Sequence, residues 1–135
     1  MDEMEITLPG GKKVNSTYKG FTVETDQPKT EGGDGSAPEP FNLFLASIGT
    51  CAGVYVVYFC QERGIDTTGI HMTLQFDRNE KKHLVEAIRI HIDLPPEFPE
   101  KYKSAVVKTA GLCTVKRNIL DPPSISVSAD VRKQP

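Results

Sequence analysis

Cysteine is scarce in this sequence, and the number of cysteines is odd. Three cysteines in 135 residues do not match the disulfide framework of a small secreted domain, which is usually denser and even in number. The chain starts with the acidic stretch Met1–Glu5 and lacks the basic and then apolar start of a secretory signal. We therefore expect a cytoplasmic protein in which any disulfide is transient and catalytic.

A strong charge of one sign is also missing. The net charge is -2, whereas nucleic-acid-binding domains usually present a basic field, so we expect no nucleic-acid partner. No apolar run is predicted to approach the roughly 20 residues that cross a bilayer, so we expect no membrane association. The length of 135 residues and the ordinary hydrophobic content of 38% fit a single domain over residues 1–135.

Hydrophobic periodicity and Gly/Pro punctuation predict an α+β chain in the order β-β-β-α-β-β-α-α-β. Alternation with glycine turns predicts three early strands, and the following Pro/Gly-rich loop is long enough to suggest a functional role. Pro40 then starts the longest apolar segment, which we predict to be a largely buried helix. The predicted elements are strands 4–8, 12–18 and 21–25, loop 26–39, helix 40–62, strands 69–77 and 85–94, helices 99–112 and 114–120, and strand 125–131.

Two cysteines occupy unlike settings. Cys51 lies within the apolar helix between Gly49 and Gly53, and a cysteine in such a place is by itself more often a small core residue. Cys113 is predicted at the start of the short helix 114–120, where the helix dipole favours its thiolate. Reactive thiolates need access and positive potential, so this pair suggests redox chemistry.

The remaining candidate ligands and nucleophiles are weaker. Cys60 follows Cys51 by two and a half helical turns, so it faces the other side of the helix and is predicted to be a core residue. No close ligand pair such as Cys-x-x-Cys occurs, and we expect no metal and no cofactor. His71 and His91 fall on the strand faces opposite the apolar residues and are predicted to face solvent.

Two motifs carry a resemblance to a known family. One is a proline-led apolar helix with a cysteine eleven residues after the proline, here Pro40 to Cys51, and the other is the box Ala110 to Arg117 around Cys113. With this order and chain length, the sequence resembles the OsmC/Ohr family of osmotically inducible and organic-hydroperoxide-resistance proteins, in its OsmC-like branch. The resemblance covers nearly the whole chain.

The resemblance implies a fold, an activity and partners. The fold is an intertwined homodimer in which a long central helix packs on sheets built from both subunits. The activity is a thiol peroxidase for organic hydroperoxides in oxidative-stress defence, with Cys51 peroxidatic and Cys113 resolving. An external dithiol reductant of the lipoyl, thioredoxin or glutathione type restores the pair.

The chain departs from the family pattern around both cysteines. Peroxidase-active members place a glutamate nine or ten residues before the first cysteine, where this chain has Asn42 and Phe41, and the nearest carboxylate is Glu39. Those members also supply an early arginine, but no arginine precedes Arg63 here. Thr114 and Lys116 replace the Pro and His of the second box. Glu39, Asn42, Lys116 and Arg117 are therefore the candidate supporting residues.

Two other functions remain open on the sequence. One is a non-catalytic or weakly active dimeric binding protein for a small apolar or electrophilic ligand, which the unmatched Arg and Glu favour. A thiol-disulfide oxidoreductase without a peroxide step is the third reading. Peroxide turnover and the alkylation rate of Cys51 distinguish these functions.

Overall fold

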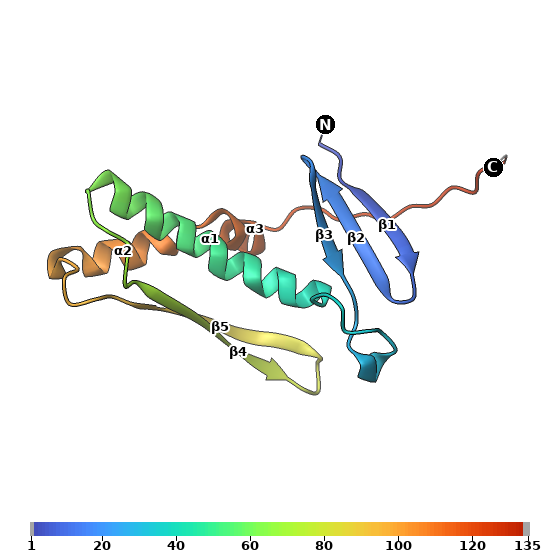
Figure 1. The fold of residues 1–135 in the computed structure, drawn as a ribbon, viewed down its shortest axis with the longest axis horizontal. Coiled ribbons are helices and arrows are strands. Elements are labelled where there is room, and N and C mark those ends of the chain that lie inside the picture. Colours follow the sequence, from blue (N-terminus) through green and yellow to red (C-terminus); the bar gives the residue numbers. More distant parts are fainter. Residues whose placement is uncertain (1, 134–135) are drawn as a thin grey trace. The chain divides into compact units, whose positions relative to one another are not determined.

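The computed structural model describes residues 2–133 and confirms a mixed α+β fold (Figure 1). The chain divides into two compact units, Met1–Thr50 and Cys51–Pro135, and helix α1 contributes to both. The elements in chain order are β1 (Glu5–Gly10), β2 (Lys13–Tyr18), β3 (Phe21–Thr25), the 3-10 turn η1 (Lys29–Glu31), α1 (Pro40–Glu62), β4 (His71–Asn79), β5 (Leu84–Asp93), the 3-10 turn η2 (Glu100–Tyr102), α2 (Lys103–Ala110) and α3 (Thr114–Leu120).

The N-terminal unit contains an antiparallel sheet in the order β1-β2-β3, as the glycine turns predict. Ile6 pairs with Ser16, and Ser16 pairs with Val23, so these side chains share one face of the sheet. The opposite face is polar, and the hydroxyls of Thr17 and Thr22 lie 3.1 Å apart on it. The apolar face is uncovered, because Ile6, Leu8, Phe21 and Val23 are all exposed.

Asp26 organises the loop between β3 and α1. Its carboxylate is buried and accepts hydrogen bonds from the Ser36 hydroxyl at 2.7 Å and from the backbone N–H groups of Ser36, Gln27 and Asp34. These bonds, that of the Ser36 hydroxyl first, hold the pKa of Asp26 far below its usual range. The Asp26 N–H also donates to the carbonyl of Pro38 at 3.2 Å, which ties the end of the loop to its start.

Helix α1 has one buried stripe and no charged residue between Glu39 and Glu62. The buried residues recur every three or four positions, which places them on one face of the helix. By length and composition α1 could cross a membrane, with a mean hydropathy of 1.9, so the prediction that no apolar run approaches that length was wrong. Core helices of soluble proteins meet the same criterion. Outside the stripe the helix is half-buried or exposed, so the predicted burial holds for one face only. The buried stripe consists of Leu45, Ile48, Ala52, Val56, Phe59 and Cys60.

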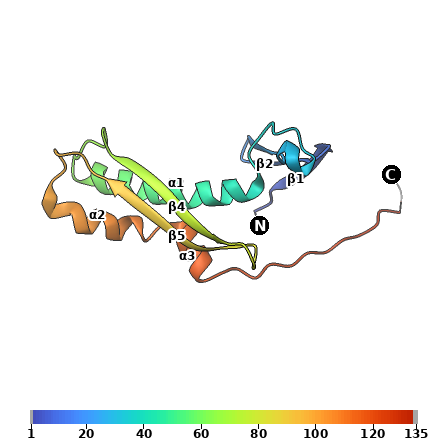
Figure 2. The same ribbon diagram turned by 90° about the horizontal axis from the view of Figure 1, so that it is seen from below.

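The core of the second unit forms where α1, the β4–β5 hairpin and α2 meet, and Figure 2 shows the hairpin running beside both helices. Met72 pairs with Ile92 and Leu74 with Ile90, which confirms the predicted apolar face of the hairpin. On the other face His71 and His91 are exposed, as predicted. The buried residues of this core are Ala52, Val56, Phe59, Cys60, Phe98, Val106 and Ala110.

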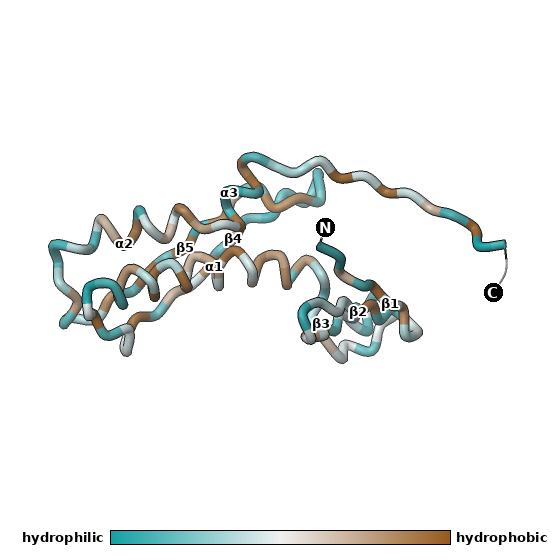
Figure 3. Tube along the Cα trace, turned by 90° about the horizontal axis from the view of Figure 1, so that it is seen from above, coloured by the Kyte–Doolittle hydropathy of each residue, from teal (hydrophilic) through white to brown (hydrophobic). Residues whose placement is uncertain are grey.

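The predicted last strand does not form. Residues 125–131 are extended without a strand assignment, and Val127 is 96% exposed and Val131 95% exposed. Figure 3 shows the apolar and polar residues alternating along this segment. Alternation places the apolar side chains on one face of an extended segment. A strand also needs a neighbouring strand to which its N–H and C=O groups can hydrogen-bond. The observed order, apart from the 3-10 turns, is therefore β-β-β-α-β-β-α-α.

Several predicted boundaries also differ from the structure, and strand β1 runs to Gly10 instead of ending at residue 8. Strand β4 continues through Asn79 after a register shift between Asp77 and Arg78, so the hairpin turn is shorter than the predicted charged turn 78–83. The predicted helix 99–112 begins as a 3-10 turn at Glu100–Tyr102 and continues as α2 only from Lys103.

Two glycine substitutions are predicted to act in opposite directions. A Cβ at Gly33 would lie 2.0 Å from the carbonyl oxygen of Gln27, so Gly33→Ala should lower the free energy of unfolding by about 1–3 kcal/mol.

In contrast, a Cβ at Gly53 would make only an ordinary contact at 3.8 Å with the Met72 sulfur. Gly53→Ala should therefore raise the free energy of unfolding by up to about 1 kcal/mol, because alanine favours a helix more than glycine does. Urea unfolding measures both, and equal effects of the two variants would contradict the close packing at Gly33.

Candidate functional site

Cys51 lies on α1 directly beside the buried stripe. Its thiol is free and half-buried, whereas its neighbour Ala52 is only 1% exposed. The position at the edge of the stripe gives a solute access to the sulfur while the backbone is held by packing. Gly53, two residues on, lies on another face of the helix, where a Cβ would be 3.8 Å from the sulfur of Met72 in β4.

Cys113 is the residue directly before α3, where the sequence predicts it. Its side chain is buried, at 1% exposure, and its sulfur accepts a hydrogen bond from the backbone N–H of Lys116 at 3.4 Å. The cysteine therefore takes the role of the N-cap side chain, which satisfies one of the free N–H groups of the first turn. Lys116 contributes its main chain here, and its ammonium group lies near Gly111.

A hydrogen-bonded cluster joins α1 to the first turn of α3. The hydroxyl of Tyr55, one turn after Cys51, lies 2.9 Å from the hydroxyl of Thr114, the residue after Cys113. Arg117 donates from Nη2 to the Tyr55 hydroxyl at 3.2 Å and to the Thr114 hydroxyl at 3.3 Å. These bonds thus join α1, one turn after Cys51, to the helix start that carries Cys113.

The sequence indicated Arg117 as a supporting residue, but Tyr55 was not among the predicted site residues. The Arg117 guanidinium hydrogen-bonds the hydroxyls of Tyr55 in α1 and Thr114 in α3. The four-residue spacing between Cys51 and Tyr55 was visible in the sequence and predicts that both lie on one helix face. The contact with Thr114 was not visible, because 59 residues separate it from Tyr55.

Glu39 and Asn42 lie together at the start of α1. The Asn42 side-chain amide donates to the Glu39 carboxylate at 3.2 Å, and the backbone N–H groups of Asn42 and Leu43 bond the Glu39 carbonyl. These contacts satisfy N–H groups that the first turn of a helix leaves free. The pair therefore has an evident part in starting α1.

Cys60 belongs to the core, as predicted. Its side chain is fully buried among the apolar residues of α1, α2 and the hairpin. Burial raises the pKa of this thiol, and the nearby charge of Arg63 opposes the shift only in part. A neutral, enclosed thiol is a poor nucleophile, so Cys60 is not part of the candidate site.

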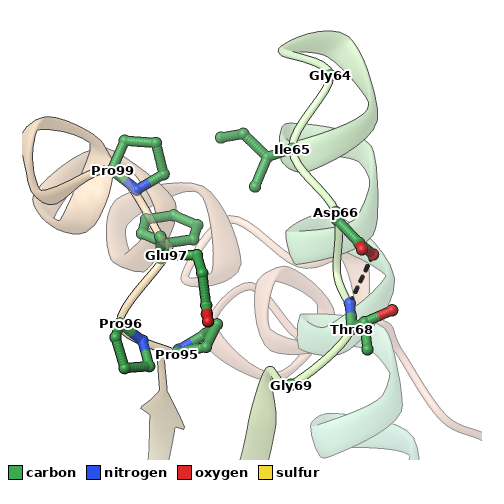
Figure 4. A pocket seen from close by; sticks show the side chains of 10 residues that line it. Gly64, Ile65, Asp66, Thr68, Gly69, Pro95, Pro96, Glu97 and Pro99 are labelled. Carbon is green, nitrogen blue, oxygen red and sulfur yellow. Dashed lines mark hydrogen bonds between the residues drawn. The ribbon is translucent and has the colours of Figure 1, made fainter.

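A separate hollow of about 680 Å³ lies between the loop after α1 and the proline-rich segment Pro95–Pro99 (Figure 4). Asp66 turns toward Thr68 and accepts a hydrogen bond from its N–H at 2.9 Å, which lowers the pKa of the carboxyl. None of the three cysteines lines this hollow. Its polar side chains are those of Asp66, Thr68 and Glu97, and it contains no thiol. Over residues 2–133, no three His, Cys, Asp or Glu side chains are grouped as metal ligands.

Comparison with known proteins supports the same fold. Residues 33–128 match the family model described as OsmC-like protein. No curated protein matches the chain. Among solved structures, a Psychrobacter arcticus protein named for osmotic stress induction and detoxification response is 21% identical with a TM-score of 0.75, and the match covers 87% of this chain and 88% of that one.

Two further structures extend the comparison. An OsmC-like protein from Mycoplasma pneumoniae is 12% identical with a TM-score of 0.70, over 90% of this chain and 89% of that chain. An organic hydroperoxide resistance protein from Legionella pneumophila is 20% identical with a TM-score of 0.57, over 88% of this chain and 90% of that chain. At these identities the likenesses show the shared fold.

Alkylation should rank the three thiols by access. We expect limiting iodoacetamide to modify Cys51 first in the native protein, because Cys60 and Cys113 are at most 1% exposed. The two buried thiols should react at least about tenfold more slowly, since they wait for local opening. Peptide mass spectrometry locates the label, and in urea all three should react alike. Native labelling of Cys60 or Cys113 as fast as Cys51 would contradict this assignment.

Proposed function

We propose that this chain, which belongs to the OsmC-like protein family, is a cysteine-based peroxidase that reduces organic hydroperoxides in peroxide stress. The observation that carries the proposal is the bridge Tyr55–Thr114–Arg117, because it links the turn of an accessible thiol, Cys51, to the helix start of a second thiol, Cys113. The shared fold with an organic hydroperoxide resistance protein supports the same role.

The chemistry needs two thiols and an external source of electrons. The Cys51 thiolate attacks the terminal oxygen of the hydroperoxide, so an S–O bond forms, the O–O bond breaks, and the alkoxide leaves as an alcohol after taking a proton. The resulting sulfenic acid condenses with the Cys113 thiol to form a disulfide and water. A dithiol of the lipoyl, thioredoxin or glutathione type then reduces the disulfide by exchange, and no metal or other cofactor takes part.

The unequal burial of the two thiols fits unequal roles. Cys51 is the accessible one and is proposed to meet the peroxide, whereas Cys113 is shielded and is proposed to meet only the sulfenic acid. A disulfide requires Cα atoms within about 7 Å, so the start of α3 and the Cys51 turn must approach that separation during resolution. The α3 helix, which has seven residues and no buried residue, is proposed to make this movement.

We further propose a cytoplasmic homodimer with sheets built from both subunits. An antiparallel three-stranded sheet normally covers its apolar face with another layer, and the β1–β3 sheet exposes that face, with Phe21 77% exposed. The segment 125–131 has an alternating pattern but no strand partner in residues 2–133. A second copy supplies both a covering layer and a free sheet edge. The cytoplasm supplies the reducing dithiols that turnover needs.

Peroxide should oxidise the wild-type protein through the two assigned cysteines. When one equivalent of cumene hydroperoxide is added to the fully reduced protein, a disulfide should form. Intact mass spectrometry should then show the protein lighter by two hydrogen atoms. Cys113→Ser should stop at a sulfenic acid that dimedone traps, and Cys51→Ser should not react. Cys60→Ser, the matched control in the core, should behave as wild type. If every thiol stays reduced in all four proteins, the chain is a binding protein on this fold.

Dimer formation should depend on the uncovered face of the N-terminal sheet. Native mass spectrometry should give twice the chain mass of 14.9 kDa for wild type. Phe21→Asp should shift the population to monomer, because it places a charge on the apolar face. Thr22→Asp, on the polar face of the same strand, is the matched control and should remain dimeric. A wild-type monomer at micromolar concentration would contradict the dimer.

A further inference from the structure

The Tyr55–Thr114–Arg117 cluster contains one hydroxyl hydrogen more than its internal bonds use. Arg117 donates to both oxygens, at 3.2 Å to Tyr55 and at 3.3 Å to Thr114. The two hydroxyls share a single hydrogen bond of 2.9 Å, in which either can be the donor. Each hydroxyl carries one hydrogen, so one of the two is left without an acceptor inside the cluster. A guanidinium that donates to both oxygens also polarises that remaining O–H bond.

The cluster lies on the Cys51 side of α1. Residues four apart on a helix are neighbours, with Cβ atoms about 5–6 Å apart, and Tyr55 follows Cys51 by four. A long side chain on a helix also leans toward the preceding turn, which here is the turn of Cys51. Both residues are only partly exposed, and the next aromatic ring along this face, that of Tyr58, packs 6.1 Å from the Tyr55 ring. The spare hydroxyl hydrogen therefore belongs to a cluster that is anchored on α1 one helical turn from Cys51.

We propose that the Tyr55–Thr114 hydroxyl pair is the proton donor of the Cys51 site and that Arg117 is its positioning residue. The proposal rests on the proposed peroxidase function. When the Cys51 thiolate attacks the terminal oxygen, the O–O bond breaks and leaves an alkoxide, which takes the spare hydroxyl proton and departs as an alcohol. The hydroxyl oxygen, left negative beside the Arg117 guanidinium, recovers a proton from a water molecule, and the hydroxide that forms carries the negative charge into solvent.

Arg117 supplies the positively charged guanidinium of this cluster. No arginine precedes Arg63, and Arg63 itself stacks 3.7 Å over the Phe59 ring at the far end of α1. Arg117 is the guanidinium that hydrogen-bonds the residue one turn from Cys51. Its fork can hold two oxygens at once, which a lysine ammonium does not reproduce in the same geometry. Arg117→Lys should therefore keep the charge and lose the alignment of the two hydroxyls.

Leaving groups of different basicity test the proton donor directly. The rate of Cys51 oxidation in a single turnover is measured with tert-butyl hydroperoxide, whose alkoxide needs a proton, and with peracetic acid, whose carboxylate does not. In the Tyr55→Phe/Thr114→Val double variant, the rate of Cys51 oxidation should fall about a hundredfold with the alkyl hydroperoxide and less than about threefold with the peracid. Tyr55→Phe alone and Arg117→Lys should show the same pattern with a smaller loss. Tyr58→Phe is the matched control and should equal wild type.

Iodoacetamide labelling of Cys51 separates chemistry from misfolding, because alkylation needs no proton donor at the leaving iodide. Wild-type labelling rates in the variants, together with a selective loss for the alkyl hydroperoxide, support the proposal. An equal loss for both peroxides, or no loss, overturns it and leaves the peroxidase function standing. If iodoacetamide labels Cys51 of the double variant at an abnormal rate, the Tyr55→Phe single variant is used in its place. A selective loss with the alkyl hydroperoxide then supports the proposal, and an equal loss or no loss overturns it. A wild-type protein that neither peroxide oxidises removes the proposed function and this proposal with it.

Discussion

The buried stripe of α1 is the constraint on which the site depends. Each large apolar side chain in that stripe contributes about 1.5–3 kcal/mol through burial, whereas each hydrogen bond of the exposed Tyr55–Thr114–Arg117 cluster contributes about 0.5–1.5 kcal/mol. Packing of residues such as Val56 and Phe59 therefore fixes the orientation of α1 about its own axis. The polar cluster forms where that orientation places its side chains. That rotation sets Cys51 at the edge of the stripe and Cys60 inside the core.

The same helix explains why two similar thiols differ in chemistry. Cys51 and Cys60 are separated by half a turn in rotation, so the burial that protects one leaves the other accessible. Around Cys51 the chain lacks the early arginine of the family pattern and instead directs Arg117 of α3 to the hydroxyl of Tyr55. Cys51, Tyr55 and the α3 residues that form this site all belong to the second unit.

Local patterns were enough to predict most elements, and contacts between distant residues were not. The proline start and apolar length of α1 gave its bounds, and the residues after Cys113 gave α3, because such signals are contained in short windows. The prediction of a strand at 125–131 was wrong because an alternating sequence does not identify the strand edge that would pair with it. Tyr55 was missed for a related reason, since its partners Thr114 and Arg117 come from a helix about sixty residues away.

The central claim is that Cys51 and Cys113 form one redox pair, and a disulfide map tests it most directly. Reduced protein is treated with one equivalent of hydroperoxide, blocked with an alkylating agent, digested without reduction and sequenced by mass spectrometry. The account predicts one linked peptide pair that joins Cys51 to Cys113, with Cys60 recovered as a blocked thiol. A linkage through Cys60, or oxidation of Cys51 to sulfinic acid with Cys113 still free, would contradict it.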